Sequence, residues 1–143
     1  NYGIGQYVEK LIPKSIKYLG LNKPIPLHNG GEPIRNWLHA NDTSEAVLTI
    51  IDSNVKNEIY NICGGFEQNN LDTVGQIIKL YHNTNLTLEE MSIYLDLSYS
   101  RQGQDVRYAL NDDKLRKLGW CPKVSFANEL PKIVNSLKEN FIW

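Results

Sequence analysis

The sequence has few cysteines and no excess of charge of either sign. Each of these two features excludes certain classes of protein. Its two cysteines, Cys63 and Cys121, lie far apart and form no CxxC motif or Cys/His pair. We therefore expect neither a disulfide framework nor a zinc site, and a reducing compartment such as the cytoplasm. Fifteen Lys and Arg against sixteen Asp and Glu give a formal net charge of -1, which excludes a global electrostatic signature of nucleic-acid or membrane-surface binding. Any anion must bind at a local site.

Long hydrophobic runs are missing as well. No segment is apolar for long enough to span a membrane, and no charged and apolar leader opens the sequence, so we expect no membrane association. A chain of 143 residues with 41% hydrophobic and 22% charged residues is typical of one globular domain. The sequence begins with Asn1 and enters a motif at once, so we expect a piece of a longer protein.

Motifs for independent catalysis are also lacking. The sequence contains no GxSxG elbow, HExxH helix or Walker loop, and no tyrosine is followed four residues later by lysine. Residues 3–8, GIGQYV, partly match the GxGxxG dinucleotide fingerprint, but Val8 replaces the third glycine and no strand precedes it. The histidines His28, His39 and His82 are scattered. We expect no catalytic residue in this chain.

Hydrophobic periodicity predicts an alternation of short strands and helices. The predicted helices cover 8–19, 42–53, 71–82, a short stretch ending at 119, and 125 onward; the predicted extended segments cover 23–28, 34–39, 58–63, 93–99 and 106–110. Asp42 and Glu45 match a capping box, and Asn70 is the predicted cap of the third helix. Pro131 predicts a kink or a late start in the last helix. The succession indicates an α/β fold with no internal boundary.

Arg35 is the first candidate for binding an anion. It lies in GEPIRNWLHAND (31–42), on a short apolar strand just before a helix. The planar guanidinium group can hold a phosphate or carboxylate with two parallel hydrogen bonds. The alternative is an ordinary ion pair with a neighbouring acid.

Three further residues could extend an anion site. Asn70 stands at a helix start beside free backbone N–H groups, although a simple N-cap is the common role there. Arg101 belongs to the polar loop SRQGQD (100–105), where Gly103 can adopt positive φ, and could be a solvated surface arginine. Lys10 lies at the start of the first helix, where the dipole disfavours a cation, but could also be solvated. Together with Arg35, these residues predict a clamp for a diphosphate.

Four segments carry a family resemblance: NYGIGQYVEKLIP (1–13), GEPIRNWLHAND (31–42), EIYNICGG (58–65) followed by NNLDTV (69–74), and SRQGQDVRYALNDDKLRKLGW (100–120). In this order and spacing the chain resembles the C-terminal part of dTDP-glucose 4,6-dehydratases, which are NAD-dependent extended short-chain dehydrogenases/reductases. The resemblance implies an α/β substrate-binding lobe whose strand 58–63 and helices complete a Rossmann sheet upstream. It places NAD and the catalytic residues in an N-terminal half before Asn1, so this chain alone would be inactive. It also implies a cytoplasmic homodimer.

The resemblance also assigns binding residues by their places in these motifs. In such enzymes NAD takes a hydride from C4 of the sugar, water leaves across C5 and C6, and the hydride returns to C6. The residues implied to bind the nucleoside diphosphate sugar are Asn1, Lys10 and Leu11 at the sugar diphosphate, Pro26, Leu27 and His28 at the nucleobase, and Arg35, Asn70, Ser100, Arg101, Gly103 and Gln104 at the phosphates and ribose.

Departures from the family pattern leave alternatives open. Ile4 and Gly5 stand where these enzymes usually have Pro-Arg, and Asn36 stands where they have aspartate. Ser100 and Gln104 replace the acid and the histidine of DRPGHD. The sequence is thus also compatible with a UDP-sugar epimerase, decarboxylase or dehydratase, or with a non-catalytic sugar-nucleotide binding module. If half of the enzyme is missing, helices 42–53 and 71–82 should expose apolar faces.

Overall fold

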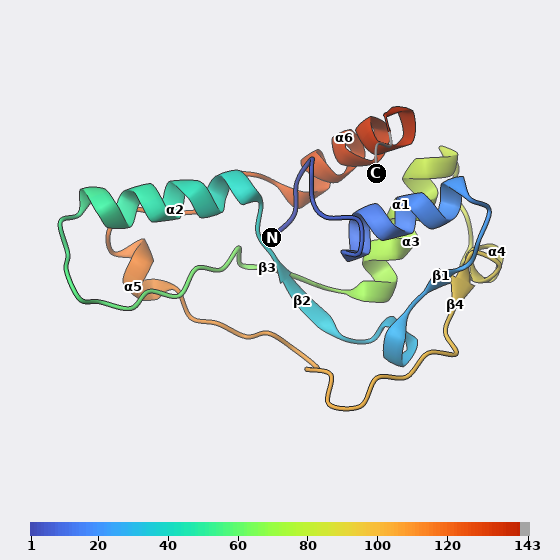
Figure 1. The fold of residues 1–143 in the computed structure, drawn as a ribbon, viewed down its shortest axis with the longest axis horizontal. Coiled ribbons are helices and arrows are strands. Elements are labelled where there is room, and N and C mark those ends of the chain that lie inside the picture. Colours follow the sequence, from blue (N-terminus) through green and yellow to red (C-terminus); the bar gives the residue numbers. More distant parts are fainter. Residues whose placement is uncertain (141–143) are drawn as a thin grey trace.

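Two short two-stranded ladders connect the helices, and no larger sheet forms among residues 1–140. The computed structural model describes residues 1–140. The parallel ladder pairs β1 with β4, and the antiparallel ladder pairs β2 with β3, with Ile34 opposite Asn69 and Trp37 opposite Phe66. The elements, shown in Figure 1, are α1 (Leu11–Gly20), β1 (Ile25–Pro26), the 3-10 helix η1 (His28–Gly31), β2 (Ile34–Trp37), α2 (Ala40–Asp52), β3 (Phe66–Asn69), α3 (Asn70–His82), α4 (Leu88–Ser92), β4 (Leu95–Asp96), α5 (Asp113–Arg116) and α6 (Phe126–Glu139).

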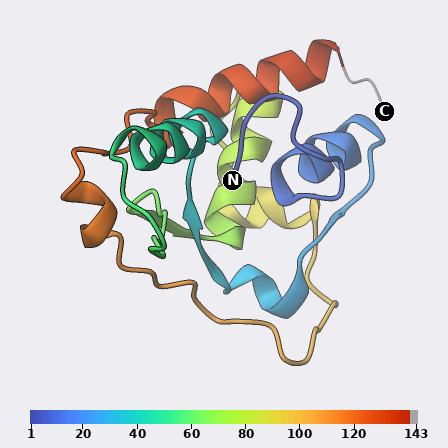
Figure 2. The ribbon, with the colours of Figure 1, turned by 60° about the vertical axis from the view of Figure 1, so that its left-hand side comes forward.

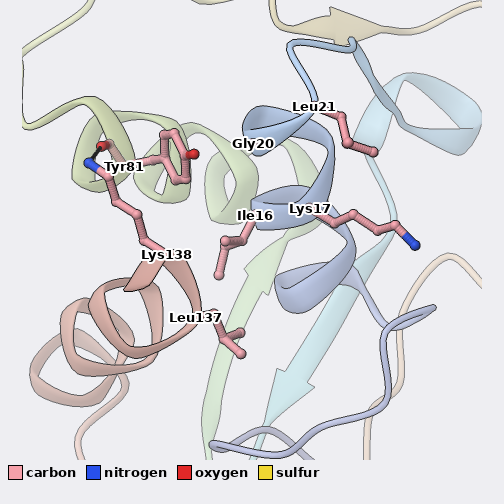
Figure 3. Close-up of a pocket in the computed structure, with 7 residues that line it drawn as sticks. All are labelled: Ile16, Lys17, Gly20, Leu21, Tyr81, Leu137 and Lys138. Atoms are coloured by element: carbon pink, nitrogen blue, oxygen red, sulfur yellow. Dashed lines mark hydrogen bonds between the residues drawn. The ribbon is translucent and has the colours of Figure 1, made fainter. Parts of the chain in front are cut away.

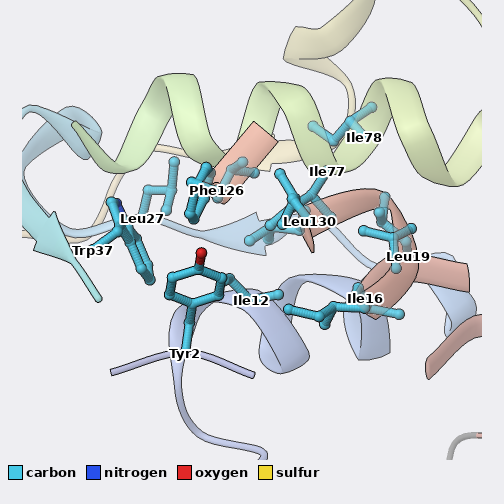
Figure 4. Close-up of a cluster of buried hydrophobic side chains, with 14 of the residues drawn as sticks. Tyr2, Ile12, Ile16, Leu19, Leu27, Trp37, Ile77, Ile78, Phe126 and Leu130 are labelled. Carbon is cyan, nitrogen blue, oxygen red and sulfur yellow. The ribbon is translucent and has the colours of Figure 1, made fainter. Parts of the chain in front are cut away.

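The main core lies between α1, α3 and α6. Each of these helices has apolar residues three or four positions apart, so each presents one buried face to the other two. Tyr2, 1% exposed, packs its ring against Trp37 and Phe126, with ring centroids 6.1 and 5.0 Å away (Figure 4). The N-terminal residues are thereby fixed to the start of α6 and the end of β2.

A second, smaller core joins α2 to α5 through Leu38, Ala46, Leu115 and Trp120. Asp42 connects this core to the segment before α6. Its carboxylate is buried and accepts the backbone N–H groups of Lys123 and Val124, each at 3.0 Å. The prediction that Asp42 caps α2 is therefore wrong, because His39 holds that position and Nδ1 of His39 accepts the N–H of Asn41.

The predicted strand 58–63 does not form. These residues run as an extended but unpaired chain, and Ile59 is 86% exposed. A strand gains stability from a neighbouring strand, and no strand among residues 1–140 lies beside this segment. The ladder partner of β2 is instead β3, which begins after Gly65.

The helix ends also differ from the prediction in several places. α1 begins at Leu11 instead of Val8, and the cap of α3 is Asn69, whose Oδ1 accepts the N–H of Asp72 at 2.6 Å. α6 begins at Phe126 and continues through Pro131, so the late start is wrong. The carbonyl that this proline leaves without an N–H belongs to the exposed Ala127, where water can replace the donor.

The apolar pattern predicts a strand over 93–99 and no helix between residues 82 and 93. The structure has the short helix α4 there, with a reciprocal capping box between Thr87 and Glu90. Only Leu95–Asp96 of the predicted strand 93–99 is paired. Because β1 has only two paired residues, β4 is limited to the same length.

The two helices predicted to expose apolar faces behave differently. Val47, Leu48 and Ile51 of α2 are exposed, which confirms the expectation for that helix. The prediction is wrong for α3, because its apolar face is buried against α1 and α6. Within residues 1–140 no helix is both long and apolar enough to cross a membrane.

Candidate functional site

The chain from Leu97 to Leu110, called here the 97–110 segment, brings several predicted binding residues together. It contains no helix or paired strand and follows the side of the molecule opposite α6, beside η1 (Figures 1 and 2). Backbone hydrogen bonds attach it at two places: Asn29 donates to the carbonyl of Tyr99 at 2.9 Å, and Ile34 donates to that of Val106 at 2.8 Å. The predicted loop 100–105 therefore spans from η1 to the start of β2.

Arg35 lies at the second attachment and has no acidic partner. The half-buried side chain donates from Nη1 to the carbonyls of Ile34 (2.8 Å) and Asp105 (3.1 Å). Its guanidinium carbon lies 4.5 Å from the ring centroid of Tyr108. None of the ion pairs within residues 1–140 involves Arg35, so the alternative of an ordinary ion pair is not realised. Guanidinium has five N–H donors, and those on Nε and Nη2 stay available for an anion.

At the first attachment, the loop meets η1. Asn29 holds the backbone of Arg101 by two hydrogen bonds, accepting its N–H at 2.8 Å and donating to its carbonyl at 3.2 Å. The ring of His28 packs edge-on against Tyr99 with centroids 5.7 Å apart. His28 and Arg101, which are distant in the sequence, thus lie on the same side of the molecule.

Asn70 is the first residue of α3 and does not cap it. Its backbone N–H donates to the carbonyl of Pro33 at 3.2 Å, next to the start of β2. η1 also packs tightly on this end of α3, because a Cβ on Gly31 would lie 2.9 Å from Cβ of Leu71. The backbone of Asn70 therefore lies beside Pro33, the residue before β2, and close to the end of η1.

Several buried polar atoms at this site lack a partner. Within residues 1–140 five buried side-chain nitrogen or oxygen atoms make no hydrogen bond, and three of them are His28 Nδ1, Asn70 Oδ1 and Gln104 Oε1, all on predicted binding residues. Leaving such an atom unsatisfied costs about 1–3 kcal/mol. A polar ligand or an ordered water that reached them would recover this free energy.

A cavity of about 330 Å³ lies beside the site and reaches from Tyr108 and Asn36, the strand neighbour of Arg35, to Asn1. Its size is at the lower end of the range for small-molecule sites. Sequence reasoning did not identify Asn36, Arg107 or Tyr108 as site residues. Arg107 and Tyr108 could have been found from their position, because they lie just after the predicted binding loop 100–105. The cavity is lined by Asn1, Asn36, Leu38, Ile62, Cys63, Arg107, Tyr108, Ala109 and Leu110.

Electrostatics within the cavity differ from those at Arg35. Arg107 is paired with Glu67, with Nη2 2.7 Å from Oε2. Burial raises the pKa of the Cys63 thiol, and the neighbouring Asp112 raises that pKa further. Cys63 is therefore a neutral thiol near pH 7 and a poor nucleophile. The cavity can bind a polar group but offers no activated side chain.

The other predicted residues are less closely joined to Arg35. Lys10 is exposed before α1, and Leu11 begins that helix. No hydrogen bond within residues 1–140 joins Lys10 or Leu11 to the 97–110 segment.

The remaining predicted residues divide between the surface and the core. Pro26 is half-buried in β1, whereas the side chain of Leu27 is 2% exposed and belongs to the core. Leu27 therefore contributes packing rather than a side-chain contact to a ligand. Ser100 and Gly103 are exposed in the loop, where Gly103 has the predicted positive φ of 69°.

A separate apolar pocket of about 260 Å³ opens between α1, α3 and α6 (Figure 3). It is polar only at its edge, where Lys138 Nζ donates to the carbonyl of Tyr81 at 2.7 Å. It contains none of the predicted binding residues. Its lining residues are Ile16, Lys17, Gly20, Leu21, Tyr81, Leu137 and Lys138.

Two kinds of site are not formed by the described residues. No group of three His, Cys, Asp or Glu side chains within residues 1–140 could hold a metal ion. The GIGQYV sequence forms a turn between Tyr2 and α1 and belongs to no βαβ unit, so it does not make a dinucleotide loop.

Comparison with known proteins places this geometry among nucleotide-sugar enzymes. Residues 1–133 match the family described as GDP-mannose 4,6 dehydratase. A human dTDP-D-glucose 4,6-dehydratase is 37% identical over 140 residues, which are 98% of this chain and 40% of the human protein. An Arabidopsis thaliana trifunctional UDP-glucose 4,6-dehydratase/UDP-4-keto-6-deoxy-D-glucose 3,5-epimerase/UDP-4-keto-L-rhamnose-reductase is 34% identical over 99% of this chain and 20% of its own.

A solved structure confirms the fold. DesIV, a dTDP-glucose 4,6-dehydratase from Streptomyces venezuelae solved with NAD bound, superposes with a TM-score of 0.85 at 33% identity, over 98% of this chain and 42% of its own. The resemblance found in the sequence motifs is thus confirmed. The chain spans about two-fifths of the length of the human relative and of DesIV.

Proposed function

Because the chain belongs to the GDP-mannose 4,6-dehydratase family, we propose that it is the substrate-binding part of an NAD-dependent dehydratase acting on a nucleoside diphosphate sugar. The preferred substrate is dTDP-glucose, which the whole enzyme converts to dTDP-4-keto-6-deoxyglucose and water. The preference follows the curated relatives that span nearly all of this chain. Catalysis itself requires residues beyond this chain, so residues 1–143 alone are inactive.

The half-buried guanidinium of Arg35, which has no acidic partner, is the observation that carries this proposal. Its Nη1 is held by two backbone carbonyls, and Tyr108 supports one face of the group. The remaining N–H donors suit the paired oxygens of a phosphate. His28, Asn70 and Gln104, three other residues proposed to bind the ligand, each have a buried polar atom without a partner.

The chain's own contribution to the reaction is positional. Hydride removal, water elimination and hydride return occur at different carbons of one sugar, so the diphosphate must stay fixed while the sugar changes. Holding it with Arg35 and its neighbours keeps each reacting carbon within reach and supplies the advantage of proximity. NAD supplies the hydride chemistry when bound. The GIGQYV turn does not fit that cofactor, so we assign NAD binding to a preceding Rossmann half.

Two surfaces suit contact with that half. The exposed residues Val47, Leu48 and Ile51 form an apolar face on α2, and segment 58–63 has unpaired backbone groups that a neighbouring strand could satisfy. The chain is then one lobe of a larger enzyme. The free thiols of Cys63 and Cys121 fit the reducing cytoplasm, and the homodimer is proposed from the family resemblance alone.

Calorimetric titration tests the proposal on the protein at its full encoded length. We expect it to bind dTDP-glucose, and the Arg35→Met variant to bind about 30- to 150-fold more weakly, because a charge-assisted contact is worth about 2–3 kcal/mol. Lys132→Met is the matched control: it removes one positive charge from an exposed pair with Glu129 on α6 and should change affinity little. Equal affinities of the Arg35→Met variant and the unmodified protein would contradict the proposal.

A UDP-sugar dehydratase is the second candidate. The Arabidopsis relative, named as acting on UDP-glucose, is 34% identical, and Ser100 and Gln104 depart from the pattern of the dTDP enzymes. Titration with UDP-glucose beside dTDP-glucose separates the two candidates. Release of a 4-keto sugar by the full-length protein distinguishes either enzyme from a binding module without activity.

A further inference from the structure

We propose that Asn29 is a positioning residue that fixes the backbone of Arg101 and thereby presents the Arg101 guanidinium to the diphosphate. The inference deepens the proposed function and rests on it. Asn29 is not among the residues that the motif resemblance assigns to binding. Its role follows from contacts that join two parts of the chain 72 residues apart.

The side-chain amide of Asn29 uses both of its polar atoms on one residue. Oδ1 accepts the N–H of Arg101 at 2.8 Å, and Nδ2 donates to the carbonyl of Arg101 at 3.2 Å. The backbone N–H of Asn29 donates to the carbonyl of Tyr99 at 2.9 Å. Asn29 alone therefore forms three hydrogen bonds to the 97–110 segment, one from its backbone and two from its side chain.

These bonds are the local constraint on an otherwise free loop. From Ser100 to Gln104, no other hydrogen bond within residues 1–140 connects the loop to the rest of the molecule. The loop has no secondary structure, and Arg101 is exposed. Fixing one residue's backbone costs about 1–2 kcal/mol of conformational entropy. The Asn29 bonds offset this cost before a ligand arrives. Ordering the backbone of Arg101 therefore does not reduce the free energy of ligand binding.

Asn29 itself is rigidly held. Its backbone is left-handed, at φ 52° and ψ 46°, a conformation that asparagine tolerates better than most residues. The neighbouring Gly31 packs against α3 with no room for a Cβ. Farther along the loop, Arg35 holds the carbonyl of Asp105. The stretch 101–105 is thus fixed at one end by Asn29 and at the other by Arg35, so Arg101 and Arg35 lie at the two ends of one short stretch.

Glycine is the informative replacement, because it accommodates the left-handed backbone, and Asn29→Gly removes the side chain that carries the amide. Titration of the full-length protein with dTDP should show about 5- to 20-fold weaker binding for this variant, the effect of losing two hydrogen bonds that order a loop. In an Arg101→Ala background the same change should have almost no further effect, because the guanidinium that Asn29 presents is gone.

A matched control and a second readout separate positioning from general stability. Asn83, the cap after α3, is also left-handed at φ 53° and lies at the other end of that helix from Asn70. Asn83→Gly should leave dTDP affinity unchanged. Backbone hydrogen exchange at residues 99–105 should accelerate in Asn29→Gly and remain unchanged in Asn83→Gly.

The outcomes distinguish the two proposals. If the unmodified protein does not bind dTDP, the proposed function fails and this inference fails with it. If the unmodified protein binds dTDP but Asn29→Gly binds equally well, the role of Asn29 is refuted while the proposed function stands. The role is also refuted if the effects of Asn29→Gly and Arg101→Ala multiply independently, or if exchange at residues 99–105 is unaltered.

Discussion

Replacing Asp42 should destabilise the protein more than replacing any other acidic residue on α2. Its carboxylate is 2% exposed and accepts two backbone N–H groups, from Lys123 and Val124, at 3.0 Å each. Its own carbonyl accepts Nε1–H of Trp120 at 3.1 Å. Asp42 therefore fastens the segment that leads into α6 onto the start of α2.

The expected magnitude follows from counting the groups left without partners. A hydrogen bond to a charged group contributes about 1.5–3 kcal/mol, so Asp42→Ala removes about 3–6 kcal/mol of such bonding. The N–H groups of Lys123 and Val124 are only partly buried, and water can reach them in the variant. We therefore expect a net loss of about 2–4 kcal/mol, a large part of a domain's total stability of about 5–15 kcal/mol. Asp42→Asn retains one acceptor oxygen and should lose about half as much.

Urea unfolding and hydrogen exchange measure this loss. Asp52→Asn is the control, since it changes an exposed acid at the end of the same helix and should alter the free energy of unfolding by less than about 0.5 kcal/mol. Exchange of the Lys123 and Val124 amides should accelerate in both Asp42 variants. A loss in Asp42→Ala no greater than that in Asp52→Asn, with those two amides still protected, would refute the reasoning.

Two further predictions concern a close contact and an acid transition. Gly64→Ala should cost about 2 kcal/mol or more in the free energy of unfolding, because the new Cβ would lie 2.1 Å from the carbonyl oxygen of Trp37; Gly20→Ala, with 3.5 Å to its nearest neighbour, should be neutral. Burial tends to raise the pKa of Asp112, but hydrogen bonds from Arg116 and a neighbouring thiol outweigh it and hold that pKa below its usual 3.8. Ionised Asp112 thus contributes stability above about pH 4 that is lost as pH falls through the lowered pKa. In urea titrations the unmodified protein and Asp112→Asn should therefore differ at pH 7 and converge as the pH falls through the lowered pKa of Asp112.

Periodic patterns predicted most of the helices, because the burial of one helix face is a local property of the sequence. The faces of α1, α3 and α6 follow the apolar spacing that the sequence displays. The segment EIYNIC has an equally clear strand composition and still stays unpaired. Strand formation depends on a neighbour that local sequence does not specify.

In the candidate site, too, local sequence properties predict some residues, whereas contacts between distant parts of the chain are not predicted. Arg35, Asn70 and the loop 100–105 were identified from their residue types and their places at element ends, and the structure gathers them around η1. The sequence does not identify Asn29 as a site residue, because its contacts with Arg101 span 72 positions. Asp42 was misread for the same reason. Its spacing to Glu45 matches a helix cap, whereas its partners lie 81 and 82 residues away.

One continuous stretch, residues 28–52, carries both the candidate ligand site and the surface proposed to meet the rest of the enzyme. η1 holds the binding loop, β2 presents Arg35, and α2 follows within three residues of the end of β2 with its exposed apolar face (Figure 1). Between them, Trp37 and Leu38 are buried in the two cores. Because a packed core is not continuously deformable, this stretch is fixed at its centre. The position of Arg35 relative to the α2 face is therefore set by the fold before either a ligand or another part of the protein binds.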